Sequence, residues 1–278
     1  QRGARTVQYG YFDDKAKEYV ITRPDTPQSW SNYLGSTEYG AIITNNCGGY
    51  GFYKSGARGR FLRLRFNAVP LDQPGRYFYL RDQDSGDYWS ASWQPVGKPL
   101  SSYQSICRHG TGYSIFRSCY EEITSEALYF VPENQLFEYW RLKVTNESDR
   151  PRSISVFTFC EFTNQWDTYQ DQVNQQYSNF IVRGYRRDNM LRIVSQENLS
   201  AKPGSERSDL AMHCWMALIG SPITGYDTSR EAFIGIYNGY HNPQVVQQGH
   251  CTNSEAYGDN ACGTFQTDLK LGPGETKE

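Results

Sequence analysis

Long apolar runs are missing from this chain of 278 residues. No stretch approaches the roughly 20 consecutive apolar residues that a membrane-spanning helix needs, and the mean hydropathy is −0.71. Basic clusters are missing as well, because 28 Lys and Arg are dispersed among 30 Asp and Glu, for a net charge of −2. Such a surface offers no electrostatic footprint for nucleic acid or an anionic membrane. We therefore expect neither as a partner.

The cysteines and histidines also lack the spacings that carry chemistry. Seven cysteines, an odd number, stand apart without a Cys-x-x-Cys pair, which disfavours a disulfide framework. His250, Cys251 and Cys262 match no usual zinc ligand set. No apolar leader follows Gln1, so no signal peptide is predicted. We expect a cytoplasmic protein without a metal or a cofactor.

Aromatic residues, by contrast, are abundant at 15%, with 22 Tyr and 6 Trp. Flat amphipathic rings suit the half-buried face of a β-sheet and also a sugar-binding surface, and both interpretations stay open here. Apolar and polar residues alternate with the period of two that is typical of strands. Such alternation, or a strand-length run bounded by turn residues, is found over residues 50–53, 62–66, 77–81, 127–131, 141–145, 153–160, 232–237 and 265–271.

These runs predict an all-β fold: an antiparallel sandwich of two large packed sheets, in one domain over residues 1–278. No stretch keeps a helical apolar spacing for more than about two turns. The polar segment 195–209 separates strands of similar character, so we interpret it as a long surface loop. Residues 272–275, Gly-Pro-Gly-Glu, form a turn that directs the chain toward another strand. We therefore expect this domain to belong to a longer protein.

Enzymes that cleave glycosidic bonds place carboxylates across the scissile bond. The candidates here are Asp13, Asp14, Asp82, Asp84, Asp87, Glu161, Asp167 and Asp171. Those before residue 90 stand in turn-like sequence, where an Asx turn or solvation is the expected role. Glu161 ends an apolar strand, which predicts burial and a raised pKa. A structural salt bridge is the role that we favour for it.

Two glycine-rich segments resemble ligand loops only in composition. Residues 48–51 lack the lysine and the following helix of a phosphate loop, so they predict a strand bend or a tight hairpin. Residues 108–113 pair Arg108 and His109 with glycine turns, which could bind an anion, but a buried structural role is the default. No Gly-x-Ser-x-Gly occurs, which excludes the esterase nucleophile elbow.

Residues 161–177 form the polar segment of greatest interest. They follow the predicted strand 153–160 and carry five Gln, two Asn and two Asp beside Trp166, Tyr169 and Tyr177. Amides and carboxylates donate and accept hydrogen bonds as sugar hydroxyls require, while an aromatic ring packs on the apolar face of a sugar. A ligand-contacting loop and an ordinary solvated loop are both consistent with this composition.

Several segments, taken in order, resemble one enzyme family. They are residues 9–35, 41–53, 86–96, 107–110, 130–132 and 159–162. Together they are similar to the N-terminal region of the inverting disaccharide phosphorylases of glycoside hydrolase family 94. The resemblance covers essentially the whole chain and implies a β-supersandwich domain. In this family that domain precedes a helical linker, an (α/α)₆ barrel with the general-acid Asp and the phosphate site, and a small C-terminal β domain. By resemblance, the chain itself holds no catalytic residue.

The resemblance also implies a reaction and a partner. The parent enzyme would cleave a β-1,4-linked disaccharide with inorganic phosphate as the co-substrate, releasing α-glucose 1-phosphate while an acid protonates the glycosidic oxygen. Family members are homodimers, and a loop that corresponds to residues 164–177 reaches the acceptor subsite of the partner. On the family's loop pattern, the substrate-binding residues here are Trp166, Asp167, Asp171, Gln172, Asn174 and Gln176.

The prediction of the acceptor sugar depends on finer similarities. Asp167 and Tyr177 replace an Asn and an Arg of the cellobiose-type pattern, which disfavours cellobiose. Residues 137–151 look most like cellobionic acid phosphorylases, which release gluconic acid, and Gln176 would then help to seat the gluconate end. Residues 81–96 and 249–263 are similar to chitobiose phosphorylase, so cellobiose and chitobiose stay as alternatives. Outside this class, a stand-alone carbohydrate-binding sandwich or a purely structural dimerisation domain would share the same composition.

Overall fold

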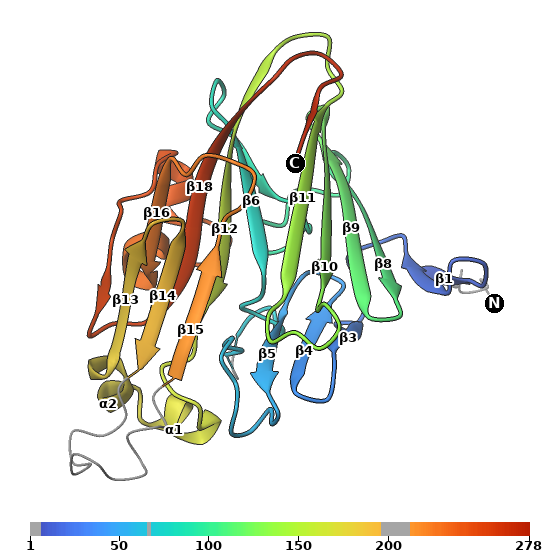
Figure 1. Cartoon of the computed structure of the whole chain (residues 1–278). Helices are drawn as coiled ribbons and strands as arrows, with labels where there is room; N and C mark the ends of the chain where they lie inside the picture. The colour runs from blue at the N-terminus through green and yellow to red at the C-terminus, as the bar shows by residue number, and fades with distance from the viewer. Residues whose placement is uncertain (1–6, 66–67, 196–211) are drawn as a thin grey trace, which may run out of the picture.

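The computed structural model describes residues 7–65, 68–195 and 212–278, which fold mainly into antiparallel strands (Figure 1). A seven-stranded sheet has the order β1 (Gly10–Asp13), β2 (Glu18–Ile21), β8 (Gln104–Gly110), β9 (Tyr113–Tyr120), β10 (Ile123–Phe130), β11 (Tyr139–Asn146), β19 (Thr276–Lys277). A five-stranded sheet has the order β16 (Gly225–Ser229), β18 (Ala261–Leu271), β12 (Arg152–Glu161), β6 (Tyr77–Asp82), β7 (Tyr88–Ser90).

Two smaller sheets and four short helices complete the described part of the chain. The four-stranded sheet has the order β15 (Met212–Ala217), β14 (Met190–Ser195), β13 (Val182–Arg187), β17 (Ala256–Tyr257). The three-stranded sheet has the order β3 (Ser31–Gly35), β4 (Tyr39–Thr44), β5 (Gly49–Tyr53). The helices are α1 (Thr168–Val173), α2 (Gln175–Phe180), α3 (Arg230–Ile234) and α4 (Gln244–Gln248).

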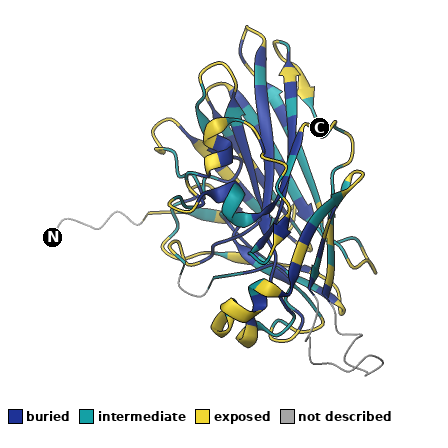
Figure 2. Ribbon diagram, turned by 90° about the vertical axis from the view of Figure 1, so that its left-hand side faces the viewer, coloured by how far each residue is buried: buried dark blue, intermediate teal, exposed yellow. Residues whose placement is uncertain are grey.

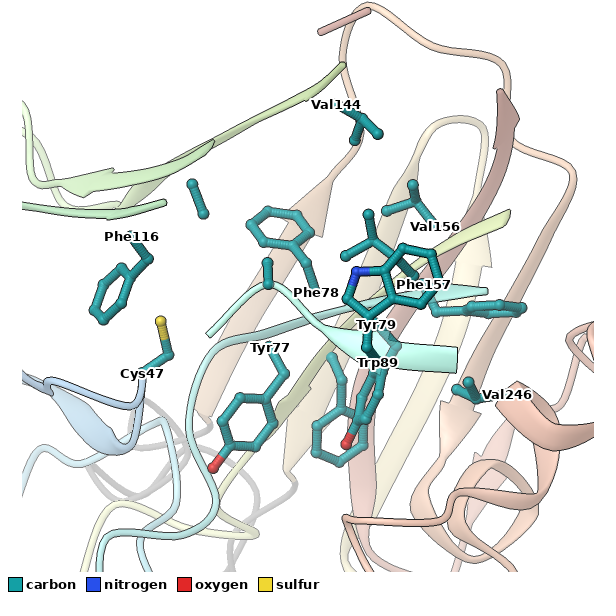
Figure 3. Packing of buried hydrophobic residues seen from close by; sticks show 14 of the residues in the cluster. Cys47, Tyr77, Phe78, Tyr79, Trp89, Phe116, Val144, Val156, Phe157 and Val246 are labelled. Atoms are coloured by element: carbon teal, nitrogen blue, oxygen red, sulfur yellow. The ribbon is translucent and has the colours of Figure 1, made fainter. Parts of the chain in front are cut away.

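The main core lies between the seven-stranded and five-stranded sheets. Phe78 of β6 packs against Tyr129 of β10 and Trp140 of β11, with ring centroids 6.0 and 6.4 Å apart. Figure 3 shows Phe116 and Val144 among the buried residues of this core. The predicted all-β sandwich is confirmed, although two smaller sheets accompany the two large ones.

The five-stranded sheet is covered on its other face too. Tyr79 of β6 and Phe159 of β12 pack against Phe233 of α3, with ring centroids 6.0 and 5.0 Å apart. All of β6 except Arg81 is therefore buried, although Phe78 and Leu80 alternate with the more polar Tyr77, Tyr79 and Arg81 in its sequence. Figure 2 shows this buried interior surrounded by more exposed loops. A second, smaller core joins the four-stranded sheet to Leu62 and Phe162.

Most of the predicted strands are confirmed, including the one expected beyond the turn at residues 272–275. There β19 pairs with β11, so that Lys277 stands opposite Val144. Residues 48–51 enter β5 from a tight hairpin, as predicted. Of the predicted surface loop 195–209, Ser195 ends β14 and the rest lies outside the described residues. Among the residues that the structure describes, no helix is long and apolar enough to span a membrane.

Two predicted strands are wrong. Residues 62–65 form an irregular segment in which Leu62 makes only an isolated bridge to Phe162, and Phe66 lies outside the described residues. The predicted strand 232–237 begins instead as part of α3, because the Ser229 hydroxyl accepts the Ala232 N–H and caps the helix. At α3 a side-chain cap decided the backbone, and alternation alone does not reveal such a contact.

Candidate functional site

The predicted site segment folds into two short helices, so the expectation of a loop is wrong for most of its length. Helices α1 and α2 meet at Asn174, which is the C-cap of α1 and the N-cap of α2. Asp167 begins α1, because its Oδ1 accepts the Gln170 N–H at 3.1 Å. The helices lie at the lower end of the four-stranded sheet in Figure 1.

Arg63 fastens this helical segment to the body of the domain. Its Nη2 lies 2.7 Å from Asp171 Oδ1, and its Nη1 lies 3.0 Å from Glu161 Oε1. Asp171 also accepts the Asn164 backbone N–H at 2.7 Å. The side chains of Arg63 and Asp171 are each 3% exposed. Asp171, a predicted binding residue, is thus engaged inside the protein, and these contacts give it a positioning role.

Glu161 is the centre of a larger buried ion cluster. It accepts a hydrogen bond from the Tyr240 hydroxyl at 2.6 Å and pairs with three arginines, Arg63, Arg65 and Arg230. Burial alone would raise the pKa of Glu161, but the guanidinium groups outweigh it and lower that pKa to about 2. The predicted salt bridge is confirmed. The predicted raised pKa is wrong, because the arginines come from segments far apart in the sequence.

This lowered pKa predicts a loss of stability in acid. A carboxylate whose folded pKa lies below its ordinary value of 4.5 stabilises the fold above that value and loses the contribution as the pH falls toward 2. The difference corresponds to about 3 kcal/mol. Urea unfolding should therefore show a gap between wild type and Glu161→Gln that is full at pH 6 and shrinks between pH 4.5 and 2. A gap that is constant over this range would contradict the assignment.

Three of the predicted binding residues face solvent. Gln172, Asn174 and Gln176 are exposed, and the ring of Tyr169 is 69% exposed beside them on α1. Amide donors and acceptors next to an aromatic ring are the groups that sugars bind. The contact of these residues with a sugar stays a prediction, now supported by their exposure.

Two hollows divide the predicted residues between them. An open hollow of about 630 Å³ is lined by Asp167 and Gln172 together with residues 56–58, Arg60, Thr168 and Tyr169. Trp166 instead lines an apolar cavity of about 510 Å³ beside Phe162, Trp215 and Met216. The six predicted residues therefore do not share one concave surface. Only Asp167 and Gln172 meet in the open hollow.

The basic residues of this hollow were missed from the sequence. Arg58 and Arg60 belong to Gly56-Ala-Arg-Gly-Arg60, which is held to α1 by a Thr168 N–H that donates to the Ala57 carbonyl at 3.0 Å. A short basic run with glycines was the only local signal. Its partners lie more than a hundred positions along the chain, so their proximity depends on the fold.

Several of the other candidate groups have structural partners. Asp13 Oδ1 accepts the Lys15 and Ala16 N–H groups in the predicted Asx turn. Asp82 also makes the predicted Asx turn, because its Oδ1 accepts the Asp84 and Ser85 N–H groups. It is buried rather than solvated, and its carboxylate pairs with Arg152 at 2.6 Å. Partial burial lowers the pKa of His109 to about 4, and its ring contacts the Ser114 hydroxyl at 2.8 Å. The Arg108 side chain is 38% exposed and pairs with Glu18, so the role of this pair is structural but only partly buried. Among the described residues, no three His, Cys, Asp or Glu side chains gather into a possible metal site.

Fold and site together define a class: an all-β domain of packed antiparallel sheets that presents exposed amides and aromatic rings on a short helical pair. Residues 17–278 match the family model described as "Glycosyl hydrolase 94, supersandwich domain", and the chain belongs to this family.

Relatives within this family are named as sugar phosphorylases. The chain is 40% identical to N,N'-diacetylchitobiose phosphorylase of Vibrio proteolyticus over 97% of its own length and 32% of the relative's. It is 30% identical to solabiose phosphorylase of Paenibacillus borealis, over 96% of this chain and 33% of that one. It is 26% identical to cellobionic acid phosphorylase of Neurospora crassa, over 74% of this chain and 24% of the relative. The chain spans about a third of the length of the first two relatives.

Proposed function

We propose that this chain is the non-catalytic supersandwich domain of an inverting disaccharide phosphorylase. The observation that carries this proposal is the 40% identity to a phosphorylase over 97% of the chain. In the proposed reaction, phosphate displaces the acceptor sugar from a β-linked disaccharide and leaves an α-sugar 1-phosphate, while an acid protonates the glycosidic oxygen. The acid and the phosphate site belong to a separate (α/α)₆ barrel domain of the parent enzyme.

The substrate that we propose is N,N'-diacetylchitobiose. It takes precedence over cellobionic acid, the acceptor suggested by residues 137–151, because the chitobiose enzyme is 40% identical to this chain and the cellobionic acid enzyme 26%. Phosphorolysis of diacetylchitobiose, cellobiose and cellobionic acid by the complete enzyme tests this choice. A sugar phosphate released fastest from cellobionic acid would restore the earlier hypothesis. Sugar binding without release from any of the three would favour a carbohydrate-binding module.

The role that we propose for the helical pair α1–α2 is to complete the acceptor subsite of the partner in a homodimer. Its exposed amides are free of the buried ion cluster that holds Asp171, so they are available to a ligand. Gln172 and Gln176 would supply donors and acceptors to the acceptor sugar, and Tyr169 a ring for its apolar face. Arg63 would keep the pair in place.

In the complete enzyme, Gln176→Ala should raise KM for the disaccharide and leave KM for phosphate unchanged. Loss of a hydrogen bond to a neutral sugar predicts a decrease of about two- to tenfold in kcat/KM, and loss of one to an aldonate carboxylate about ten- to hundredfold. Steady-state kinetics with each substrate varied in turn measure both effects.

Gln104→Ala is a matched control, because Gln104 is an exposed glutamine on β8 in the seven-stranded sheet. It should behave as wild type. Equal kinetics for wild type and Gln176→Ala on every disaccharide would reduce α1–α2 to a solvated surface.

A further inference from the structure

Arg60 occupies an unusual position in the wall of the open hollow. Its guanidinium lies over the ring of Tyr50, with its central carbon 3.9 Å from the ring centroid. Its Nε is buried and has no hydrogen-bond partner among the described residues. A buried donor without a partner costs free energy unless a ligand or water satisfies it. The buried Nε is out of reach of a ligand in the hollow, so an acceptor from outside the domain would meet the Nη groups of Arg60.

The charge of Arg60 is also left without a direct ion pair. Burial lowers its pKa, and Tyr50 and Asp171 oppose that effect, yet an arginine stays protonated at neutral pH. Asp171 is the nearby carboxylate, but Arg63 already occupies both of its oxygens, at 3.1 and 2.7 Å. None of the ion pairs found in the described part of the chain includes Arg60. A partly desolvated guanidinium favours a strongly accepting oxygen such as a carboxylate or an amide carbonyl.

The neighbours of Arg60 narrow the kind of ligand. Asp167 and Thr168 are engaged locally, since Asp167 caps α1 and the Thr168 hydroxyl donates to the Gly56 carbonyl. Gln172 and Tyr169 are exposed at the same hollow. The free groups at the hollow are thus the guanidinium groups of Arg58 and Arg60, one amide and one aromatic ring, and of the two arginines only Arg60 is partly buried. This set of groups suits a sugar that carries one strongly accepting substituent.

We propose that Arg60 is a specificity-determining residue of the acceptor subsite, where its guanidinium donates to a carbonyl or carboxylate oxygen on the acceptor sugar. This inference rests on the proposed function, and adds to it a residue outside the helical segment. The acetamido group of N-acetylglucosamine and the carboxylate of gluconate share the chemistry that Arg60 would recognise. Glucose lacks it.

The test measures acceptor use by the complete enzyme in the direction of synthesis. The probes are N-acetylglucosamine, gluconate and glucose, each with the matching α-sugar 1-phosphate. The quantity compared is kcat/KM with gluconate or N-acetylglucosamine, whichever the enzyme prefers, divided by kcat/KM with glucose. Arg60→Met should lower this ratio by roughly ten- to hundredfold, as expected for loss of a hydrogen bond to a charged donor. KM for the sugar 1-phosphate should not change. A loss confined to gluconate identifies the carboxylate, and one confined to N-acetylglucosamine identifies the acetamido group.

Arg183→Met is the matched control, because Arg183 makes a similar contact with a ring, 4.8 Å from the centroid of Tyr257, away from this hollow. It should keep the acceptor ratio of wild type. Arg60→Lys retains the charge but not the planar fork of donors, so it should lower the ratio by roughly tenfold. If Arg60→Met does not fold, the same acceptor ratio is measured with Arg60→Lys instead.

Two outcomes would overturn the proposal. One is an equal loss on all three acceptors, which would mean that Arg60 serves only to pack against Tyr50. The other is an unchanged ratio in Arg60→Met while Gln176→Ala still raises KM for the disaccharide, because the acceptor subsite would then exist without Arg60. A wild-type enzyme that releases no sugar phosphate would instead refute the proposed function itself.

Discussion

Arg63→Met is expected to lower the free energy of unfolding by about 3–5 kcal/mol, because removal of one partner from a buried ion pair leaves the other charge uncompensated. Here Asp171, 2.7 Å from Arg63, loses its ion-pair partner. Glu161, 3.0 Å from Arg63, loses one of three arginines and keeps Arg65 and Arg230. Urea unfolding followed by tryptophan fluorescence measures the change. Hydrogen exchange should also quicken over residues 168–180, which Asp171 no longer holds.

Arg117→Met provides the control, because Arg117 is exposed on β9 and its loss should change stability by less than about 0.5 kcal/mol. The double variant Arg63→Met/Asp171→Asn separates the pair from the rest of the cluster. It should be destabilised by less than the sum of the two single changes, since they share one interaction. Additive effects would show that the Arg63–Asp171 ion pair does not hold the helices. A loss of stability below about 1 kcal/mol in Arg63→Met would show the same.

Phe159→Ala is expected to cost about 3–5 kcal/mol through a cavity at the centre of the fold. Phe159 is 0% exposed, and its ring lies 5.0 Å from that of Phe233 and 5.8 Å from that of Tyr240. Thermal or urea unfolding measures the loss. Phe159→Leu retains most of the apolar volume and should cost less than about 1.5 kcal/mol.

Phe12→Ala is the control for this change, because Phe12 on β1 is 76% exposed and its truncation opens no buried cavity. Its effect should stay within about 0.5 kcal/mol of wild type. If Phe159→Ala were as mild as Phe12→Ala, the contact between the five-stranded sheet and α3 would be loose rather than a packed core.

Arg63→Met tests the buried ion cluster and Phe159→Ala tests the hydrophobic core, and the two are connected through Tyr240. Tyr240 accompanies both Phe159 and Glu161, since its ring lies in the core and its hydroxyl donates to the carboxylate at 2.6 Å. The buried ion cluster is therefore continuous with the hydrophobic core. Through Arg63 that cluster also reaches α1, so the surface proposed to meet the acceptor sugar depends on the interior of the sandwich.

Alternation of apolar and polar residues was sufficient to predict β10 and β11, because a strand with one wet face must repeat every two residues. β12 and β18, buried on both faces, were predicted as strand-length runs bounded by turn residues. Alternation also predicted the antiparallel sandwich. The same pattern did not reveal that β6 is covered on both faces, since tyrosine is compatible with a buried or an exposed position. The family resemblance added the supersandwich, which the family match over residues 17–278 bears out.

The candidate site was predictable in its composition and not in its geometry. Residues 161–177 stood out by their amides, yet their division between two hollows and a buried clamp depends on Arg60 and Arg63, about a hundred positions earlier. Local sequence determined the strands, the turns and the polar character of the site, because those depend on near neighbours and on period. Tertiary structure alone decided which carboxylates are neutralised and that Arg60 lies over Tyr50 without an ion pair among the described residues, because burial and Coulomb attraction depend on distances that only folding sets.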